Sequence, residues 1–168
     1  MTLDGYIGKE DGSSPGFAFT GSHVDAYQEH LRGYAAIVMG RGTYEIGYAY
    51  GMKPGDRPYG ERPHFVFSNT LDLPAHPQLT VVRTDTLEAI DAIKAEAHGE
   101  VYLCGGGQLA GFLLANNRID KLLLKVSPMV YGTGIKLFEQ FSGLRDFVFK
   151  DVTTYDTGVI LLEYVAKR

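Results

Sequence analysis

The sequence predicts an α/β protein whose central sheet is mostly parallel and ends in antiparallel strands. Short apolar runs alternate with stretches of helical spacing through most of the chain, as they do where helices join parallel strands. The last part of the chain instead contains three strands in succession, with a hairpin turn expected at Thr157-Gly158. At 168 residues the chain is long enough for one sizeable core, so residues 1–168 are expected to form a single domain.

Strands are expected where short apolar runs are bounded by turn residues. The first such segment, 1–7, has the pattern of the end of a strand that carries Asp4-Gly5. The other segments are 35–39, 64–67, 80–83, 101–104, 119–130, 144–155 and 158–166. Within 119–130, Leu122, Leu124 and Val126 alternate with other side chains, which is the period of a strand.

Helices are expected between these strands. The first covers 23–33, with Ser22 as its N-cap and Gly33 at its end. A short helix opens after the glycine turn at Gly40. Two more are marked by apolar residues at helical spacing: Leu87, Ile90 and Ile93 in one, and Leu109, Phe112 and Leu113 in the other. The segments 8–22 and 47–62 are rich in glycine and proline and are expected to be loops.

Three unusual turns each follow an expected strand. They are Gly40-Arg41-Gly42-Thr43, Ser68-Asn69-Thr70 and Gly105-Gly106-Gly107. In parallel sheets ligands bind at the carboxyl ends of strands, and a glycine turn that opens a helix suits a phosphate group. A tight turn without a ligand is the alternative. The glycines match neither the dinucleotide fingerprint nor a P-loop, because the acidic residue of the first and the Gly-Lys-Ser/Thr of the second are missing.

The composition narrows the classes of partner. The chain is 45% hydrophobic and 21% charged, and its formal net charge of −4 gives no reason to expect a nucleic acid or a membrane surface as partner. Its N-terminal residues lack the pattern of a signal peptide, and a single cysteine, Cys104, fits a cytoplasmic location. The five histidines show no metal-ligand spacing, so no metal is expected.

Taken together, six segments in order are similar to the dihydrofolate reductase-like superfamily, and most of all to stand-alone relatives of the riboflavin-biosynthesis reductase domain. The segments are Leu3-Asp4-Gly5-Tyr6-Ile7, the stretch Met39 to Glu45, the stretch Val66 to Leu71, the stretch Gly105 to Leu114, Ile119-Asp120 and the stretch Pro128 to Phe138. The resemblance covers nearly the whole chain. Two departures are expected: the strand before Leu3 is shortened, and the deaminase domain that accompanies the riboflavin reductase is absent.

The resemblance implies a three-layer fold, with a mostly parallel central sheet, an antiparallel C-terminal hairpin and flanking helices. It also implies NADPH as the hydride donor and a homodimer with the late strands in the interface. The residues it assigns to the cofactor are Gly40, Arg41, Gly42, Thr43, Ser68, Asn69, Gly105, Gly106, Gly107, Gln108 and Leu109. Arg83, just past an expected strand, is a further candidate for the 2′-phosphate, with a solvated surface arginine as the alternative.

A reductase that acts on an imine or a ring-opened ribose also needs a proton donor. Asp4 and Asp25 are the candidates; the alternatives are a turn cap for Asp4 and a helix-dipole carboxylate for Asp25. The resemblance thus implies an NADPH-dependent reductase of a small heterocyclic substrate, similar to 5-amino-6-(5-phosphoribosylamino)uracil reductase. The alternatives are a dihydrofolate or pteridine reductase, a nucleotide-binding protein without turnover, and a purely structural domain.

Overall fold

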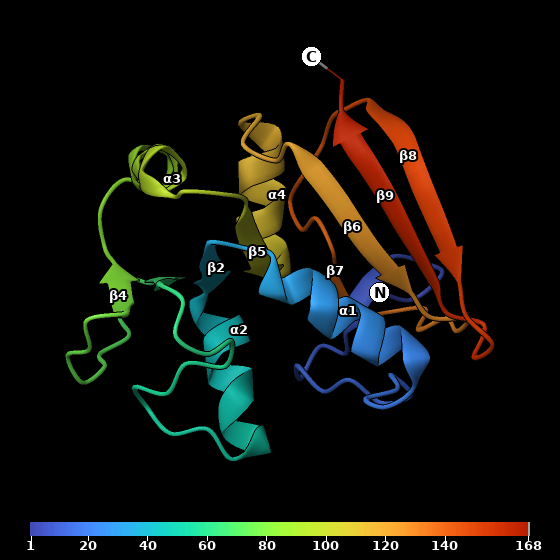
Figure 1. The fold of residues 1–168 in the computed structure, drawn as a ribbon, viewed down its shortest axis with the longest axis horizontal. Helices are drawn as coiled ribbons and strands as arrows, with labels where there is room; N and C mark the ends of the chain where they lie inside the picture. The colour runs from blue at the N-terminus through green and yellow to red at the C-terminus, as the bar shows by residue number, and fades with distance from the viewer. Residues whose placement is uncertain (168) are drawn as a thin grey trace. The chain divides into compact units, whose positions relative to one another are not determined.

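The computed structural model describes residues 1–167, which fold as two compact units (Figure 1). One unit, here called unit 1, consists of Met1–Gln28 and the chain from Ala110 onward, and the other, unit 2, is Glu29–Leu109. Unit 2 contains a parallel four-stranded sheet, and unit 1 contains an antiparallel three-stranded sheet with the C-terminal hairpin. The expected class, a mixed α/β fold with parallel strands followed by antiparallel ones, is therefore confirmed.

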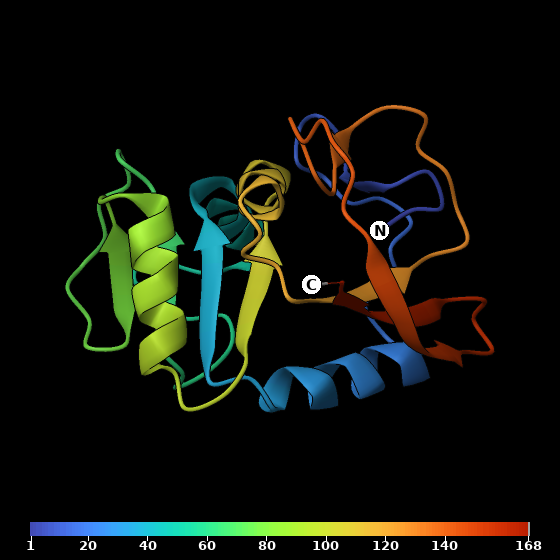
Figure 2. The ribbon, with the colours of Figure 1, turned by 90° about the horizontal axis from the view of Figure 1, so that it is seen from above.

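The sheet of unit 2 has the strand order β4-β3-β2-β5. Its strands are β2 (Ala36–Gly40), β3 (His64–Phe67), β4 (Leu79–Val82) and β5 (Val101–Gly105). All three pairings are parallel, and the arrows of β2 and β5 point the same way in Figure 2. Because the strands are parallel, the turns that follow β2, β3 and β5 lie along one edge of this sheet.

The core of unit 2 forms around β2. This strand is almost entirely buried, as expected for a central parallel strand with both faces covered. Its Ile37 and Met39 pack with Val66, Leu71, Leu79 and the ring of Tyr44. Tyr44 belongs to α2 (Arg41–Ile46), so the same core that buries β2 also fixes the short helix that follows it.

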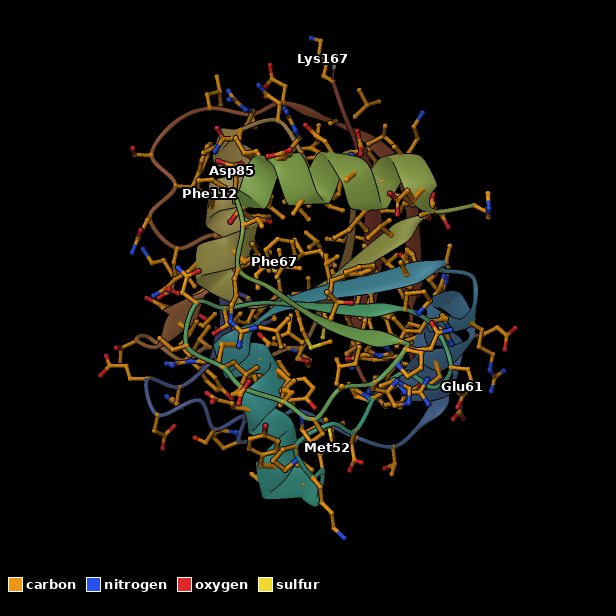
Figure 3. All side chains as sticks on the ribbon, turned by 90° about the vertical axis from the view of Figure 1, so that its left-hand side faces the viewer. Met52, Glu61, Phe67, Asp85, Phe112 and Lys167 are labelled. Atoms are coloured by element: carbon orange, nitrogen blue, oxygen red, sulfur yellow. The ribbon has the colours of Figure 1, made fainter. Side chains whose placement is uncertain are left out.

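Two further helical segments of unit 2 have clear local causes. The 3₁₀ turn η1 (Gly47–Tyr50) continues α2 and ends at Gly51, whose φ of 91° is left-handed. Helix α3 (Thr86–Glu96) is capped by Asp85, whose side chain accepts hydrogen bonds from the N–H groups of Leu87 and Glu88; Figure 3 labels this residue at the start of the helix.

The antiparallel sheet of unit 1 has the order β6-β9-β8, with β6 at Lys121–Val126, β8 at Phe147–Thr154 and β9 at Ile160–Ala166. The expected hairpin turn is present. The N–H of Tyr155 donates to the carbonyl of Val159, and the N–H of Gly158 donates back to Tyr155. A second, two-stranded sheet pairs β1 (Tyr6–Gly8) with β7 (Ile135–Lys136).

The start of the chain differs from the expectation. The segment 1–7 is expected to be the end of a strand, but β1 begins only at Tyr6, and Leu3 and Asp4 form a turn. This turn is attached to the end of β6, because the N–H of Leu3 donates to the carbonyl of Met129 and the N–H of Ser127 to that of Met1. Strand β6 ends at Val126, earlier than the expected 130.

Helices α1 (Ser22–Arg32) and α4 (Gly107–Ala115) lie where periodicity predicts them. Ser22, however, is the first residue of α1, and its hydroxyl donates to Asp156 at 3.3 Å. The first turn is instead closed by the carbonyl of Gly21, which accepts from Val24 and Asp25. Among the residues described, no helix has the length and apolar character needed to cross a membrane.

Candidate functional site

The carboxyl ends of β2 and β5 approach each other closely in unit 2. A Cβ atom at Gly40, the last residue of β2, would lie 3.7 Å from the backbone nitrogen of Gly106 and 3.9 Å from Cβ of Leu109. Gly105 has a φ of 136°, and the Gly105–Gly106 peptide bond is cis. A Cβ at Gly106 would lie 3.0 Å from Oγ1 of Thr43. These glycines bring two strand ends together with half-buried bare backbone between them.

The start of α2 lies beside this bare backbone. Gly42 is exposed, and a Cβ placed there would meet no atom within 4 Å, so there is open space next to the turn. On the other side, Gly107 and Gln108 open α4, whose first N–H groups have no partner within the helix. We call Gly40, Gly42, Thr43, Gly105 and Gly106 the glycine cradle. Exposed backbone and a hydroxyl beside a helix start are what a pyrophosphate requires.

The turn after β3 is held by its own hydroxyl. Oγ of Ser68 accepts hydrogen bonds from the N–H groups of Thr70 at 3.2 Å and Leu71 at 3.0 Å. Asn69, between them, is exposed. The side chain of Ser68 thus shapes this turn, and the side chain of Asn69 is accessible to a ligand.

Two arginines reach this turn from the neighbouring strands. Arg41, after β2, donates from Nη1 to Oγ1 of Thr70 at 2.8 Å. Arg83, after β4, donates from Nη2 to the carbonyl of Leu71 and lies 3.6 Å from Oδ1 of Asp72. Because β3 lies between β2 and β4, the turn is flanked by a guanidinium on each side. Arg83 thus contacts the turn after β3 and is also exposed, so both its proposed role at the 2′-phosphate and its alternative as a solvated surface arginine are compatible with this position.

Arg41 also contacts a carboxylate. Its Nε atom lies 3.4 Å from Oε2 of Glu45, one helical turn further along α2. Glu45 is not among the site residues predicted from the sequence, and Thr70 is predicted only as part of the turn after β3. The spacing of Arg41 and Glu45 is the i,i+4 signal by which the pair is detectable. The bond to Thr70 joins residues 29 positions apart, and no local pattern indicates it.

Asp4 lies in unit 1, in the turn between Thr2 and β1. Its carboxylate accepts from the hydroxyl of Thr2 at 2.6 Å, the N–H of Gly132 at 2.7 Å and the N–H of Tyr131 at 3.1 Å. These bonds, that of Thr2 first, lower the pKa of Asp4 to about 2. All three bonds stabilise the ionised carboxylate and hold it in this turn, so the geometry favours the role of turn cap for Asp4 over that of proton donor.

Asp25 has different surroundings. It lies in the first turn of α1, and its side chain is exposed. The first turn of a helix is also where a carboxylate interacts favourably with the helix dipole. Both proposed roles of Asp25, proton donor and helix-dipole carboxylate, are compatible with this position. Among the described residues, no group of His, Cys, Asp and Glu is arranged to hold a metal ion.

The parallel sheet, its glycine turns and the antiparallel hairpin define a dihydrofolate reductase-like fold, and solved structures of that class align with the whole chain. More closely, the model of the RibD C-terminal domain family matches residues 1–161. The chain therefore belongs to the RibD C-terminal domain family, which is a reductase family, and the resemblance expected from the sequence is confirmed.

The chain is also similar to individual proteins. The chain is 27% identical to the uncharacterized protein YwjB of Bacillus subtilis (strain 168) over 162 residues, which are 96% of this chain and 91% of YwjB. A structure named "Putative riboflavin biosynthesis protein" from Shewanella sp. PV-4 superposes with a TM-score of 0.79 at 24% identity, covering 100% of this chain and 96% of that one. Dihydrofolate reductase from Enterococcus faecalis, solved with NADP(H), has a TM-score of 0.70 at 20% identity, covering 100% and 93%.

Proposed function

We propose that this protein is an NADPH-dependent reductase of a small heterocyclic substrate. The observation that carries the proposal is the glycine cradle between the ends of β2 and β5, next to a turn flanked by two guanidinium groups. Membership of a reductase family supports it. So does the fold shared with a dihydrofolate reductase that was solved with NADP(H).

The cofactor residues divide into two groups by their chemistry. In this proposal the pyrophosphate is held by backbone groups and by the hydroxyl of Thr43. The residues that supply them are Gly40, Gly42, Thr43, Gly105, Gly106, Gly107, Gln108 and Leu109. The adenosine 2′-phosphate lies by the turn after β3, near Ser68 and Asn69, where Arg41 and Arg83 supply positive charge. When bound, the nicotinamide supplies the hydride, and the protein supplies position and electrostatics.

The proton that accompanies the hydride comes, in this proposal, from Asp25 or from water held by it. Asp25 is an exposed carboxyl group, whereas the carboxylate of Asp4 is occupied by hydrogen bonds from Thr2, Tyr131 and Gly132. A proton source near the acceptor carbon is required because hydride transfer leaves negative charge on the neighbouring atom, and water held by the Asp25 side chain can supply that proton.

For the substrate we propose a compound like 5-amino-6-(5-phosphoribosylamino)uracil, in keeping with the RibD C-terminal domain family. Dihydrofolate or a pteridine is the second candidate, favoured by the structural likeness to dihydrofolate reductase. The test is to mix the purified protein with NADPH and each compound and to follow the loss of nicotinamide absorbance. Oxidation of NADPH with only one of them identifies the class. Binding of NADPH without oxidation by either supports a nucleotide-binding protein without turnover.

We also propose a cytoplasmic homodimer with the late strands in its interface. Strand β8 is at the edge of its sheet and exposes the apolar side chains of Val148, Phe149 and Val152. An exposed apolar edge strand is a surface that pairs readily with another chain. Light scattering of the wild type should give the mass of a dimer, and Phe149→Lys should shift it to a monomer. A monomer mass for the wild type contradicts the proposal.

A further inference from the structure

Arg41 already has a negatively charged partner before any ligand arrives. Its Nε atom lies 3.4 Å from Oε2 of Glu45, while its Nη1 atom donates to Thr70. The side chains of Arg41 and Glu45 are 52% and 40% exposed, so the pair lies at the surface, where a ligand can reach it. The local charge of this pair is therefore close to zero, although an arginine is present.

A phosphate that binds Arg41 must share the guanidinium with this carboxylate. Two negative groups on one guanidinium repel each other, and the repulsion falls with distance and with added salt. A ligand without a phosphate at this position does not experience the repulsion to the same extent. Glu45 therefore lowers the affinity for a 2′-phosphorylated nucleotide more than it lowers the affinity for the same nucleotide without that phosphate.

Arg83 also has a carboxylate partner, but the interaction is weaker. Asp72 lies 3.6 Å from Nη2 of Arg83, but its side chain is 99% exposed. A fully exposed carboxylate is well screened by water and free to move away from its partner. Glu45 is less exposed, and α2 holds it one turn from Arg41. Of the two carboxylates, Glu45 is the one placed to act on a bound phosphate.

We propose that Glu45 is a specificity-determining residue, which reduces the preference of this protein for NADPH over NADH by competing for Arg41. The inference rests on the proposed function, because it takes Arg41 as a ligand of the 2′-phosphate. Glu45 itself does not contact the reacting atoms. It acts on the charge that Arg41 offers to the cofactor.

The variant Glu45→Gln separates charge from geometry. Glutamine keeps an oxygen that accepts from Nε of Arg41, and it removes only the negative charge. The matched control is Glu96→Gln at the end of α3, which is an exposed residue of the same unit and changes the net charge equally. Glu96 lies at the opposite end of α3 from the turn that follows β4, so its charge is remote from Arg41 and Arg83.

The experiment titrates wild type, Glu45→Gln and Glu96→Gln with NADPH and with NADH, following nicotinamide fluorescence. In parallel, thermal shifts are measured with adenosine 2′,5′-bisphosphate and with adenosine 5′-monophosphate. Glu45→Gln is expected to raise the affinity for NADPH about 1.5-fold to about fivefold, the range of effects known for exposed ion pairs, with little change for NADH. The gain should shrink at high salt, and Glu96→Gln should show no gain.

The outcomes separate this inference from the proposed function. Equal changes for NADPH and NADH, or no change in Glu45→Gln while the wild type binds NADPH, overturn the role of Glu45 and leave the reductase proposal intact. A wild type that binds neither dinucleotide nor the bisphosphate overturns the proposed function, and the inference with it. A gain limited to the two ligands that carry a 2′-phosphate supports both.

Discussion

The Oγ1 atom of Thr43 lies 3.0 Å from the position that a Cβ atom on Gly106 would occupy. The corresponding distance for Gly105 is 3.4 Å. Thr43 belongs to α2, Gly105 is the last residue of β5 and Gly106 follows it, so this contact joins the two halves of the glycine cradle. A side chain at Gly106 must displace Thr43 or the backbone that carries it.

Gly106→Ala should therefore weaken cofactor binding. We expect a loss of about tenfold or more in NADPH affinity, or about 1.4 kcal/mol, because the added methyl group forces the cradle apart. The measurement is a double-mutant cycle with Thr43→Ala, which removes the atom that the methyl group meets. The loss caused by Gly106→Ala should be smaller in the Thr43→Ala background. An equal loss in both backgrounds shows that the contact with Thr43 does not shape the cradle.

Substitution of Gly111 in α4 is expected to change the stability of the protein rather than its binding of NADPH. A Cβ at Gly111 would lie 1.9 Å from the carbonyl oxygen of Glu139, a backbone atom that cannot move aside cheaply. Gly111→Ala should lower the free energy of unfolding by about 1–3 kcal/mol, although alanine is the better helix former. Urea denaturation measures the difference.

The control for Gly111→Ala is Gly42→Ala. Gly42 is also a helical glycine, but a Cβ atom there would meet no atom within 4 Å. This variant should be as stable as the wild type or slightly more stable. If Gly111→Ala proves as stable as Gly42→Ala, the close packing of α4 on the segment around Glu139 is not present in solution.

The surroundings of His64 lead us to expect that the free energy of unfolding depends on pH. The ring is fully buried; Nδ1 donates to the carbonyl of Arg62 at 2.6 Å, and Nε2 accepts from the N–H of Tyr59 at 3.3 Å. Both contacts are satisfied only by the neutral ring. Burial lowers the pKa of His64 most; the hydrogen bond to the carbonyl of Arg62 opposes this shift, and the charges of Arg57 and Arg62 lower the pKa further.

Because the pKa of His64 is lower in the folded state than its ordinary value of about 6.5, the unfolded chain binds the proton more tightly. The contribution of the neutral His64 ring to the free energy of unfolding is therefore complete above a pH of about 6.5, and it is lost progressively as the pH falls below this value. Urea midpoints at a series of pH values should fall more steeply for the wild type than for His64→Asn. Parallel curves for the two proteins contradict this account of His64.

The two aspartates should differ in what their substitution changes. Asp4→Asn removes the charge that two backbone N–H groups and Thr2 stabilise, so it should lower stability and leave NADPH affinity nearly intact. Asp25→Asn should leave both unchanged and abolish turnover, once a substrate is in hand. Steady-state rates and thermal melting of both variants provide the comparison. If neither substitution slows the reaction, the proton comes from another group.

Much of the sheet was predictable because its signals are local. The apolar run 64–67 is the strand His64–Phe67, and the glycine turns after β2 and β5 are where the sequence predicts them. The lowered pKa of Asp4 was not predictable, since its partners Tyr131 and Gly132 lie far along the chain. The same holds for the contact of Arg83 with the turn after β3. Local patterns determine strands and turns, whereas the surroundings of each charged group depend on which distant segments meet.

The central claim is that the glycine cradle and the arginines beside it bind NADPH, and a fluorescence titration of the purified protein with NADPH and NADH tests it most directly. We predict saturable NADPH binding in the micromolar range, weaker NADH binding, and a clear loss of NADPH affinity in Gly42→Ala, whose fold should be unchanged. Binding of neither dinucleotide, or NADPH binding that Gly42→Ala leaves intact, would contradict the claim.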